Sequence, residues 1–307
     1  MNSCIRYLIV VLTTSACAAG GLWDAHTHLS MYGLSALDSL HAHNVVGVRD
    51  LGANKLEEIL QWRDEIRSGN RTGPRICTAG VILDGPKEDS STRWIIRTEA
   101  EAARAVDSLA KRKVDFIKTH NGLSPAVYFA ILRAAKEHHL KVVSHLPRGI
   151  PAWTAADSGA GSIEHAAESM MASPIYAGYA KTFPEAVAWW NSPAGDSAIV
   201  RLKKSGVYFT PTLGLYAANV DLPSDSVLRA QRRSALPSLV ELTRKMYRAG
   251  IPIMAGSDIA AVRADYRPGQ SLIEELSWLR RAGLSERDLQ RAASGNVRAW
   301  LNQSACL

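Results

Sequence analysis

The sequence predicts an α/β fold, a (β/α)8 TIM barrel over residues 21–307. Short apolar runs alternate along the chain with amphipathic helical stretches, which is the pattern of parallel βαβ units. Eight such units fill roughly 280 residues, a typical size for this barrel. The sequence contains no linker, low-complexity tract or internal repeat that would divide the domain. A doubly wound parallel sheet is the alternative for the same alternation.

The order of the elements supports eight strand–helix units. The expected strands lie at residues 22–26, 45–48, 75–83, 114–118, 141–145, 162–165, 207–210 and 251–255. Helix starts are marked by Thr98 with Glu101, by Ser124 with Pro125, and by Ser285 with Asp288 before a last helix that ends near Leu301. These pairs are capping signals, because a side-chain oxygen accepts a hydrogen bond from a free backbone N–H in the first turn.

The composition limits the classes of function. Of the 307 residues, 47% are hydrophobic and 21% are charged, as in a soluble globular protein. The net charge of +7 comes from basic residues scattered over helix faces without interleaved aromatic residues, so nucleic-acid binding is not expected. The cysteines show no spacing typical of a zinc site, and Cys77 and Cys306 are too far apart in sequence to predict a disulfide.

Residues 1–20 are typical of a bacterial secretory leader, with Arg6, a short apolar run and then small residues. The apolar run is too short to span a bilayer. Cys17 is placed as the acylated cysteine of a lipoprotein would be, which would tether the protein to a membrane. Cleavage near Ala18, or a short N-terminal helix or strand, are the alternatives. We therefore expect an exported protein, in the periplasm or lipid-anchored at the bacterial envelope.

Metal-binding or ionisable residues gather at the ends of the predicted strands, where a barrel keeps its catalytic residues. The residues are His26 and His28, Lys118, His145, His165 and Asp258. The two histidines of the HxH pair are two positions apart, so on a strand they share one face and can reach one ion. Imidazoles and carboxylates suit zinc, with manganese, iron or cobalt as alternatives. Taken singly, each histidine is more commonly a satisfied core residue.

Lys118 ends an apolar strand, where a charged side chain is unexpected. As an ammonium it has no lone pair and cannot bind a cation. Burial lowers the pKa of a lysine and exposes a neutral amine, to which carbon dioxide can add. The resulting carbamate has two oxygens that can bridge two metal ions about 3.5–4 Å apart. A lysine that extends along the strand end to solvent is the alternative.

The order HxH, Lys, His, His, Asp resembles the amidohydrolase superfamily. The nearest branch is the imidazolonepropionase-related one, with prolidase-like and carboxypeptidase-like enzymes, and the likeness covers roughly residues 21–301. Supporting phrases are "GLWDAHTHL", "GVRDLG", "GPRICTAGVILDGP", "DFIKTHNGLS", "AADSGAGSIEHA" and "IPIMAGSD". The resemblance implies two divalent ions, one held by His26, His28 and Asp258, the other by His145 and His165, with carboxylated Lys118 bridging both.

The resemblance also implies hydrolysis of an amide C–N bond, in a small peptide or an N-acyl amino acid. A metal-bridging hydroxide would attack the substrate carbonyl, and Asp258 would act as general acid and base. A lactonase or phosphotriesterase on the same site, or a non-catalytic barrel lipoprotein, are the alternatives. Members of this branch usually carry a small β-sandwich, for which this sequence has few residues on either side of the barrel. We expect a barrel-only variant or a truncated form.

The substrate would be a small molecule or short peptide, and three residues after strand ends are candidates to contact it. His120 and Arg148 could hold a substrate carboxylate, and Tyr216 could contact the substrate or an oxyanion. The alternatives are that Arg148 is a rim charge, that His120 is a polar loop residue, and that Tyr216 packs beneath its loop. The sequence leaves these alternatives open.

Overall fold

The computed structural model describes residues 20–53, 55–86, 91–222, 224–259, 266–302 and 306–307. The predicted leader, apart from Gly20, lies outside the described residues, as does Cys17. Among the helices of the described part, none combines the length and the apolar character needed to cross a membrane.

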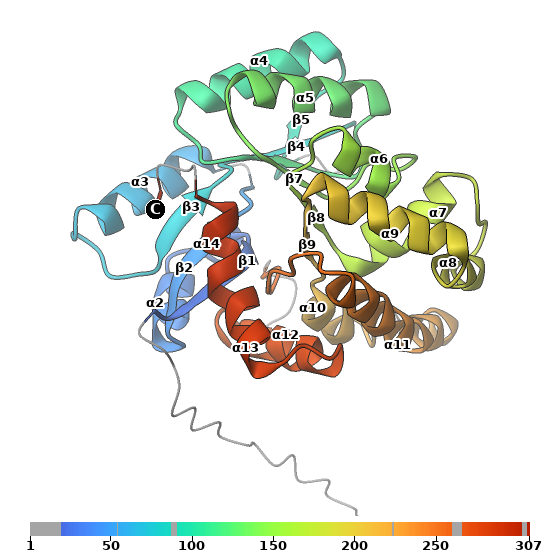
Figure 1. Ribbon diagram of the computed structural model, residues 1–307. Coiled ribbons are helices and arrows are strands. Elements are labelled where there is room, and N and C mark those ends of the chain that lie inside the picture. Colours follow the sequence, from blue (N-terminus) through green and yellow to red (C-terminus); the bar gives the residue numbers. More distant parts are fainter. Residues whose placement is uncertain (1–19, 54, 87–90, 223, 260–265, 303–305) are drawn as a thin grey trace, which may run out of the picture.

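The strands form two parallel sheets in the middle of the molecule (Figure 1). The first has the order β1-β2-β3 and the second the order β5-β4-β6-β7-β8-β9. The strands are β1 (Leu22–Thr27), β2 (Val45–Asp50), β3 (Arg75–Thr78), β4 (Ile82–Asp84), β5 (Trp94–Ile95), β6 (Ile117–Thr119), β7 (Val142–Ser144), β8 (Ser162–Glu164) and β9 (Tyr208–Thr210). The fold is therefore a mixed α/β fold with parallel sheets, resembling a TIM barrel.

The third predicted strand, residues 75–83, is wrong as a single strand. The chain turns at Gly80, whose φ of +73° lies in the left-handed region that glycine adopts without strain. The part before this turn, β3, pairs with β2, and the part after it, β4, pairs with β6. A single bridge between Ala53 and Val81 lies beside the turn.

The eighth predicted strand, residues 251–255, is also wrong as a regular strand. The longer segment 251–259 makes single bridges instead, from Ile253 to β9 and from Ile259 to β1. Asp258 in this segment has a φ of +54°, which does not continue a strand ladder. The segment nevertheless lies between β9 and β1, as the predicted order requires.

The helices lie around the outside of the strands (Figure 1). They are α1 (Leu29–Tyr32), α2 (Ser35–Ala42), α3 (Leu56–Arg67), α4 (Glu99–Lys111), α5 (Pro125–Glu137), α6 (Ala152–Asp157), α7 (Ser173–Tyr176), α8 (Phe183–Trp190), α9 (Pro193–Ser205), α10 (Leu213–Ala218), α11 (Ser226–Arg248), α12 (Gln270–Arg281), α13 (Glu286–Gln290) and α14 (Asn296–Trp300), with π-helices η1 (Ala166–Met171) and η2 (Arg291–Gly295). The three predicted caps are confirmed, because Thr98, Ser124 and Ser285 each accept a backbone hydrogen bond in the first turn of their helix.

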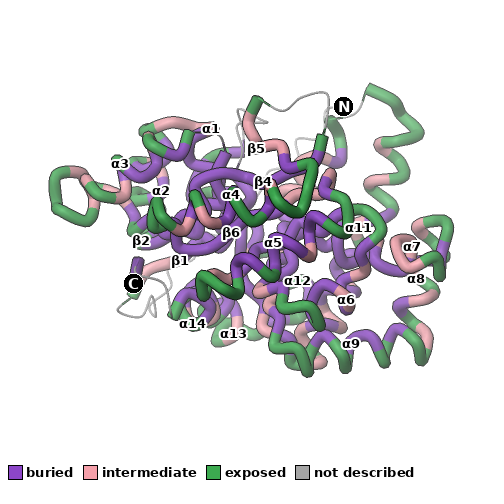
Figure 2. The backbone as a smooth tube through the Cα atoms, turned by 90° about the horizontal axis from the view of Figure 1, so that it is seen from above, coloured by how far each residue is buried: buried purple, intermediate pink, exposed green. Residues whose placement is uncertain are grey.

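Buried residues follow the strands and the inward faces of the helices, while the outward faces are exposed (Figure 2). The larger apolar cluster lies mainly between strands and helices. A second cluster includes Phe116, Val143, Met254 and Trp300. The Phe116 and Trp300 rings meet edge to face, with centroids 5.4 Å apart, so the last helix is packed against a residue just before β6.

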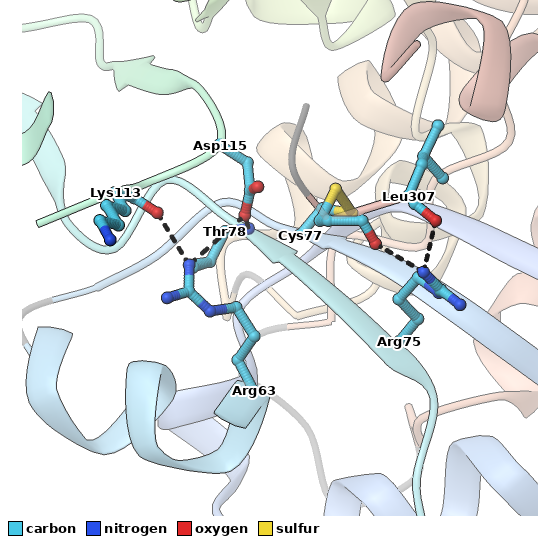
Figure 3. Close-up of a disulfide and its surroundings, with 8 residues drawn as sticks. Arg63, Arg75, Cys77, Thr78, Lys113, Asp115 and Leu307 are labelled. Atoms are coloured by element: carbon cyan, nitrogen blue, oxygen red, sulfur yellow. Dashed lines mark hydrogen bonds and ion pairs between the residues drawn. A yellow bond between two sulfur atoms is a disulfide. The ribbon is translucent and has the colours of Figure 1, made fainter. Parts of the chain in front are cut away.

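A disulfide joins Cys77 of β3 to Cys306 near the end of the chain (Figure 3). The two cysteines are 229 residues apart in sequence, and their spacing gave no basis for predicting the bond. Beside it, an Arg75 nitrogen donates hydrogen bonds to the carbonyl oxygens of Cys306, at 2.9 Å, and Leu307, at 2.6 Å. The C-terminal residues are thus held against β3 both covalently and by hydrogen bonds.

Glu275 of α12 should make stability depend on pH. It is fully buried, its Oε2 accepts a 2.6 Å hydrogen bond from the Gly214 N–H, and burial raises its pKa to about 8. Between pH about 4.5 and 8 the folded protein keeps a proton that the unfolded chain releases, so this group lowers the free energy of unfolding as pH rises, by up to about 1.4 kcal/mol per unit.

We expect Glu275→Gln to remove this contribution, so that the variant gains stability relative to the wild type as pH rises from 5 to 8. Urea unfolding at pH 5, 6.5 and 8 measures the difference. Parallel pH dependence of the two proteins would contradict the prediction.

Candidate metal centre

A cavity of about 540 Å³ opens beside the ends of the strands. All six predicted metal ligands line it: His26, His28, Lys118, His145, His165 and Asp258. These side chains come from β1 or the residue after it, from β6, from the residues that follow β7 and β8, and from the segment between β9 and β1. The parallel strands bring them together because their carboxyl ends meet on one face.

Asp258 is the centre of the histidine cluster. Its Oδ1 lies 3.2 Å from His26 Nε2 and 3.4 Å from His28 Nε2, and its Oδ2 lies 3.7 Å from His165 Nδ1. Ligand atoms of His26, His165 and Asp258 all lie within 4.8 Å of one another. The His145 ring centroid is 4.4 Å from that of His165. Imidazoles and a carboxylate thus converge on one small volume.

Three of the histidine rings are oriented by a partner at Nδ1. His26 Nδ1 lies 2.9 Å from Glu164 Oε2, and His28 Nδ1 lies 2.6 Å from the Gly52 carbonyl oxygen. An acceptor at Nδ1 places the proton there and leaves Nε2 with its lone pair. His165 Nδ1 makes a 2.9 Å hydrogen bond with the Thr212 hydroxyl, which fixes that ring as well.

Behind His26 lies a fully buried ion pair of Glu164 and Arg49. Arg49 Nη2 donates to Glu164 Oε1 at 3.0 Å, and its Nε donates to the Ala25 carbonyl at 2.7 Å. The guanidinium lies 4.5 Å from the Trp300 ring centroid. Burial opposes the charge on Glu164, but Arg49 and His26 hold the pKa of this carboxyl well below its usual range. Glu164 therefore presents a permanent negative charge to His26.

The side chains of the cluster differ in the direction in which their pKa values are shifted. Burial favours neutral His26, but attraction to Asp258 outweighs it and raises the pKa of His26. Burial also opposes the charge on Asp258, but the neighbouring histidines hold its pKa well below the usual range. Burial lowers the pKa of both His145 and His165 well below the usual range. These two rings are neutral near pH 7 and can offer lone pairs.

Lys118 is buried, with 1% of its surface exposed, and lines the same cavity. Its Nζ has no hydrogen-bond partner among the described residues. Burial lowers the pKa of Lys118 to about 8, against the attraction of Glu164 and Asp258. A buried ammonium without a hydrogen-bond acceptor is costly, which favours the neutral amine at this position.

A divalent metal ion fits this donor set. His26 Nε2 is buried and, although 3.2 Å from Asp258 Oδ1, makes no hydrogen bond within the described residues. This nitrogen therefore faces the Asp258 carboxylate and can offer its lone pair to a metal ion. Two histidines and a carboxylate within 4.8 Å are a ligand set that zinc and similar ions accept.

Backbone strain also concentrates here. His165, Thr212 and Asp258 all have positive φ, at 72°, 53° and 54°. Residues other than glycine adopt this region at a cost of order 1–3 kcal/mol each, and such residues cluster at functional sites. Gly256, two residues before Asp258, lets the chain pack closely on β1, since a Cβ there would lie 2.7 Å from the His26 Cβ.

Of the three predicted substrate contacts, two line the cavity and one does not. His120 and Tyr216 line the cavity, whereas Arg148 is exposed and is not among the lining residues. His120 Nδ1 lies 3.1 Å from Asp84 Oδ2, and burial lowers the pKa of His120 to about 4. Burial raises the pKa of Tyr216, so its phenol stays protonated.

Sequence reasoning did not single out several charged residues that the structure places at the site. Arg93, Glu168 and Arg232 line the cavity, while Arg49 and Glu164 support His26 from beneath. Arg49 and Glu164 could have been noticed as charges inside apolar strands, as Lys118 was. The sequence offers no such signal for Arg232, which lies on α11.

Solved structures of known proteins share this fold. No protein-family model matches the sequence, and no curated protein matches it. The bottromycin amidohydrolase superposes with a TM-score of 0.73 at 21% identity, covering 92% of this chain and 67% of that one. A Xaa-Pro dipeptidase with methionine bound in its active site gives 0.68 at 19% identity, covering 92% and 75%. A. niger ochratoxinase gives 0.67 at 18% identity, covering 92% and 71%.

These neighbours are members of the amidohydrolase superfamily, and this chain has their fold. The family resemblance seen in the sequence is confirmed at the level of the fold.

Proposed function

We propose that this protein is a metal-dependent hydrolase of amide bonds, acting on a small peptide or an N-acyl amino acid. The observation that carries the proposal is the convergence of six metal-capable side chains on one cavity at the strand ends. The neighbours in fold are amidohydrolases and prolidases, which supports the choice of a C–N bond. Two divalent ions, with zinc as the first choice, are part of the proposal.

Lys118 carries a carbamate in this proposal. Its depressed pKa leaves a substantial fraction of neutral amine near pH 8. The amine nitrogen attacks carbon dioxide, a C–N bond forms, and the nitrogen loses a proton to solvent, which gives a carboxylate at the end of the side chain. This form has acceptor oxygens where the ammonium has only donors.

Bound divalent ions would polarise a substrate carbonyl and make water a nucleophile near neutral pH. Asp258 then takes the proton of the attacking water and returns it to the leaving amine, since its carboxylate faces the cavity and stays ionised. Glu164 keeps His26 oriented with Nε2 toward Asp258. His120 and Tyr216 lie at the same cavity and are the chain's candidates to orient the carbonyl.

The test uses protein purified without chelators. We expect about two metal ions per chain by elemental analysis, turnover of dipeptides or N-acyl amino acids, and loss of turnover after chelation that added zinc reverses. A panel with lactones and a phosphotriester separates the bond types. Near-zero metal together with no amide turnover would overturn the proposal in favour of a non-catalytic barrel.

Export to the periplasm, with lipid anchoring at Cys17, is a further part of the proposal. The Cys77–Cys306 disulfide supports it, because such bonds persist in oxidising compartments. Mass spectrometry of the N-terminus from membrane and soluble fractions tests both points; an unprocessed, unmodified N-terminus in the cytoplasm would contradict them.

A further inference from the structure

Two arginines reach the cavity from different sides, and their surroundings differ. Arg93 comes from the loop before β5 and Arg232 from α11, which lies on a different side of the strands (Figure 1). Arg93 Nε lies 3.5 Å from the fully buried Asp84 carboxylate, which balances its charge. Neither arginine belongs to the metal-ligand cluster.

Arg232 has no carboxylate within 4.0 Å among the described residues. Its Nη1 donates a 3.2 Å hydrogen bond to the Asn219 carbonyl at the end of α10, which holds the side chain across the gap between α10 and α11. Its backbone carbonyl accepts a 3.4 Å hydrogen bond from the Tyr216 hydroxyl. The guanidinium is thus half-buried and positioned, and most of its donors are free.

Glu168 also lines the cavity, and it interacts with Arg232 electrostatically, but the two side chains form no ion pair. A guanidinium that is partly removed from water and lacks a paired anion favours an anionic ligand. Its planar fork matches a carboxylate, which it can bind with two parallel hydrogen bonds. Met31, Ile82 and Leu215 give the same cavity an apolar lining for the rest of a ligand.

We propose that Arg232 binds a free carboxylate of the substrate, so that this site selects acids over their neutral amides. This inference rests on the proposed function and narrows its substrate class to N-acyl amino acids and peptides with a free carboxyl terminus. Arg232 takes the place that the sequence had suggested for the exposed Arg148.

The test compares Arg232→Gln with wild type on a series of N-acetyl-L-amino acids, with small, apolar, aromatic and basic side chains, and on their carboxamides. We expect wild type to prefer the acids. The variant should raise KM for the acids by roughly 10- to 100-fold, the range for one lost hydrogen-bonded charge contact. KM for the amides, kcat and metal content should change little. Arg232→Lys should fall between the two.

Arg233→Gln is the matched control, because Arg233 is the next residue on α11 but has a side chain 70% exposed and pairs with Asp221. It should behave as wild type. Calorimetric binding of free L-amino acids and L-amino acid amides runs alongside and needs no turnover, so it still tests Arg232 if the proposed hydrolysis is wrong. Equal affinity of wild type for acids and amides, or an equal effect of Arg232→Gln on both, would overturn the inference.

Discussion

Replacing Lys118 with alanine should reduce amide turnover by on the order of 10³-fold, as expected when a group that organises charge at the reaction centre is lost. If Lys118 carries the proposed carbamate, the metal content should fall by one ion per chain, because the oxygens that would bridge the two ions are gone. We expect the variant to keep the fold, because the Lys118 side chain lines the cavity and its Nζ makes no hydrogen bond within the described residues. Elemental analysis and kcat/KM measure the two effects.

Rescue distinguishes a missing ligand from a damaged fold. Formate, acetate or propionate should restore part of the activity and the second ion to Lys118→Ala, because each supplies a carboxylate that fits the vacated space. Lys111→Ala is the control, since that side chain is 74% exposed on α4 and should neither lose activity nor respond to added acid. Wild-type activity in Lys118→Ala would be incompatible with the bridging role.

Replacing Arg49 with methionine should lower the free energy of unfolding by about 3–5 kcal/mol, because it leaves the Glu164 charge buried without its partner. Methionine keeps much of the length of the side chain, so the packing against Trp300 is partly retained. Denaturant unfolding measures the loss. The same variant should bind metal more weakly, since Glu164 no longer holds a fixed charge behind His26.

The double variant Arg49→Met with Glu164→Gln separates stability from metal binding. It removes both charges, so its stability should exceed that of Arg49→Met alone. Metal affinity should stay roughly 10–100-fold below wild type, because the partner of His26 is still altered. Arg201→Met, which breaks a half-exposed pair with Asp157, serves as the control and should change neither quantity appreciably. A double variant as unstable as the single one would contradict the pairing.

The meeting of the candidate ligands at one cavity was largely predictable because parallel βα units impose a rule on position. Each of the six candidate ligands ends or follows an apolar run, and in parallel βα units those positions meet on one face. The same rule says nothing about a residue that reaches the cavity from an outer helix. The sequence therefore gives no reason to select Arg232. It does favour Arg148, which follows a strand end, but the structure shows that this residue is exposed.

The irregular parts of the fold were less predictable for a different reason. The turn at Gly80 interrupts an apolar run that composition alone marks as one continuous strand, and the left-handed Asp258 follows another such run. Neither conformation alters hydrophobic periodicity, so a reading of periodicity passes over them. The Cys77–Cys306 bond was not predicted either, since residues far apart along the chain can lie close together in the fold.

That bond divides the candidate ligands into two groups by covalent connection. The cross-link closes a loop that contains Lys118, His145, His165 and Asp258, and leaves His26 and His28 on the segment before it. In an oxidised unfolded chain the looped ligands stay within a bounded distance of one another, whereas the HxH segment diffuses freely at one end. Formation of the centre then requires the free HxH segment to reach ligands that the disulfide already keeps near one another.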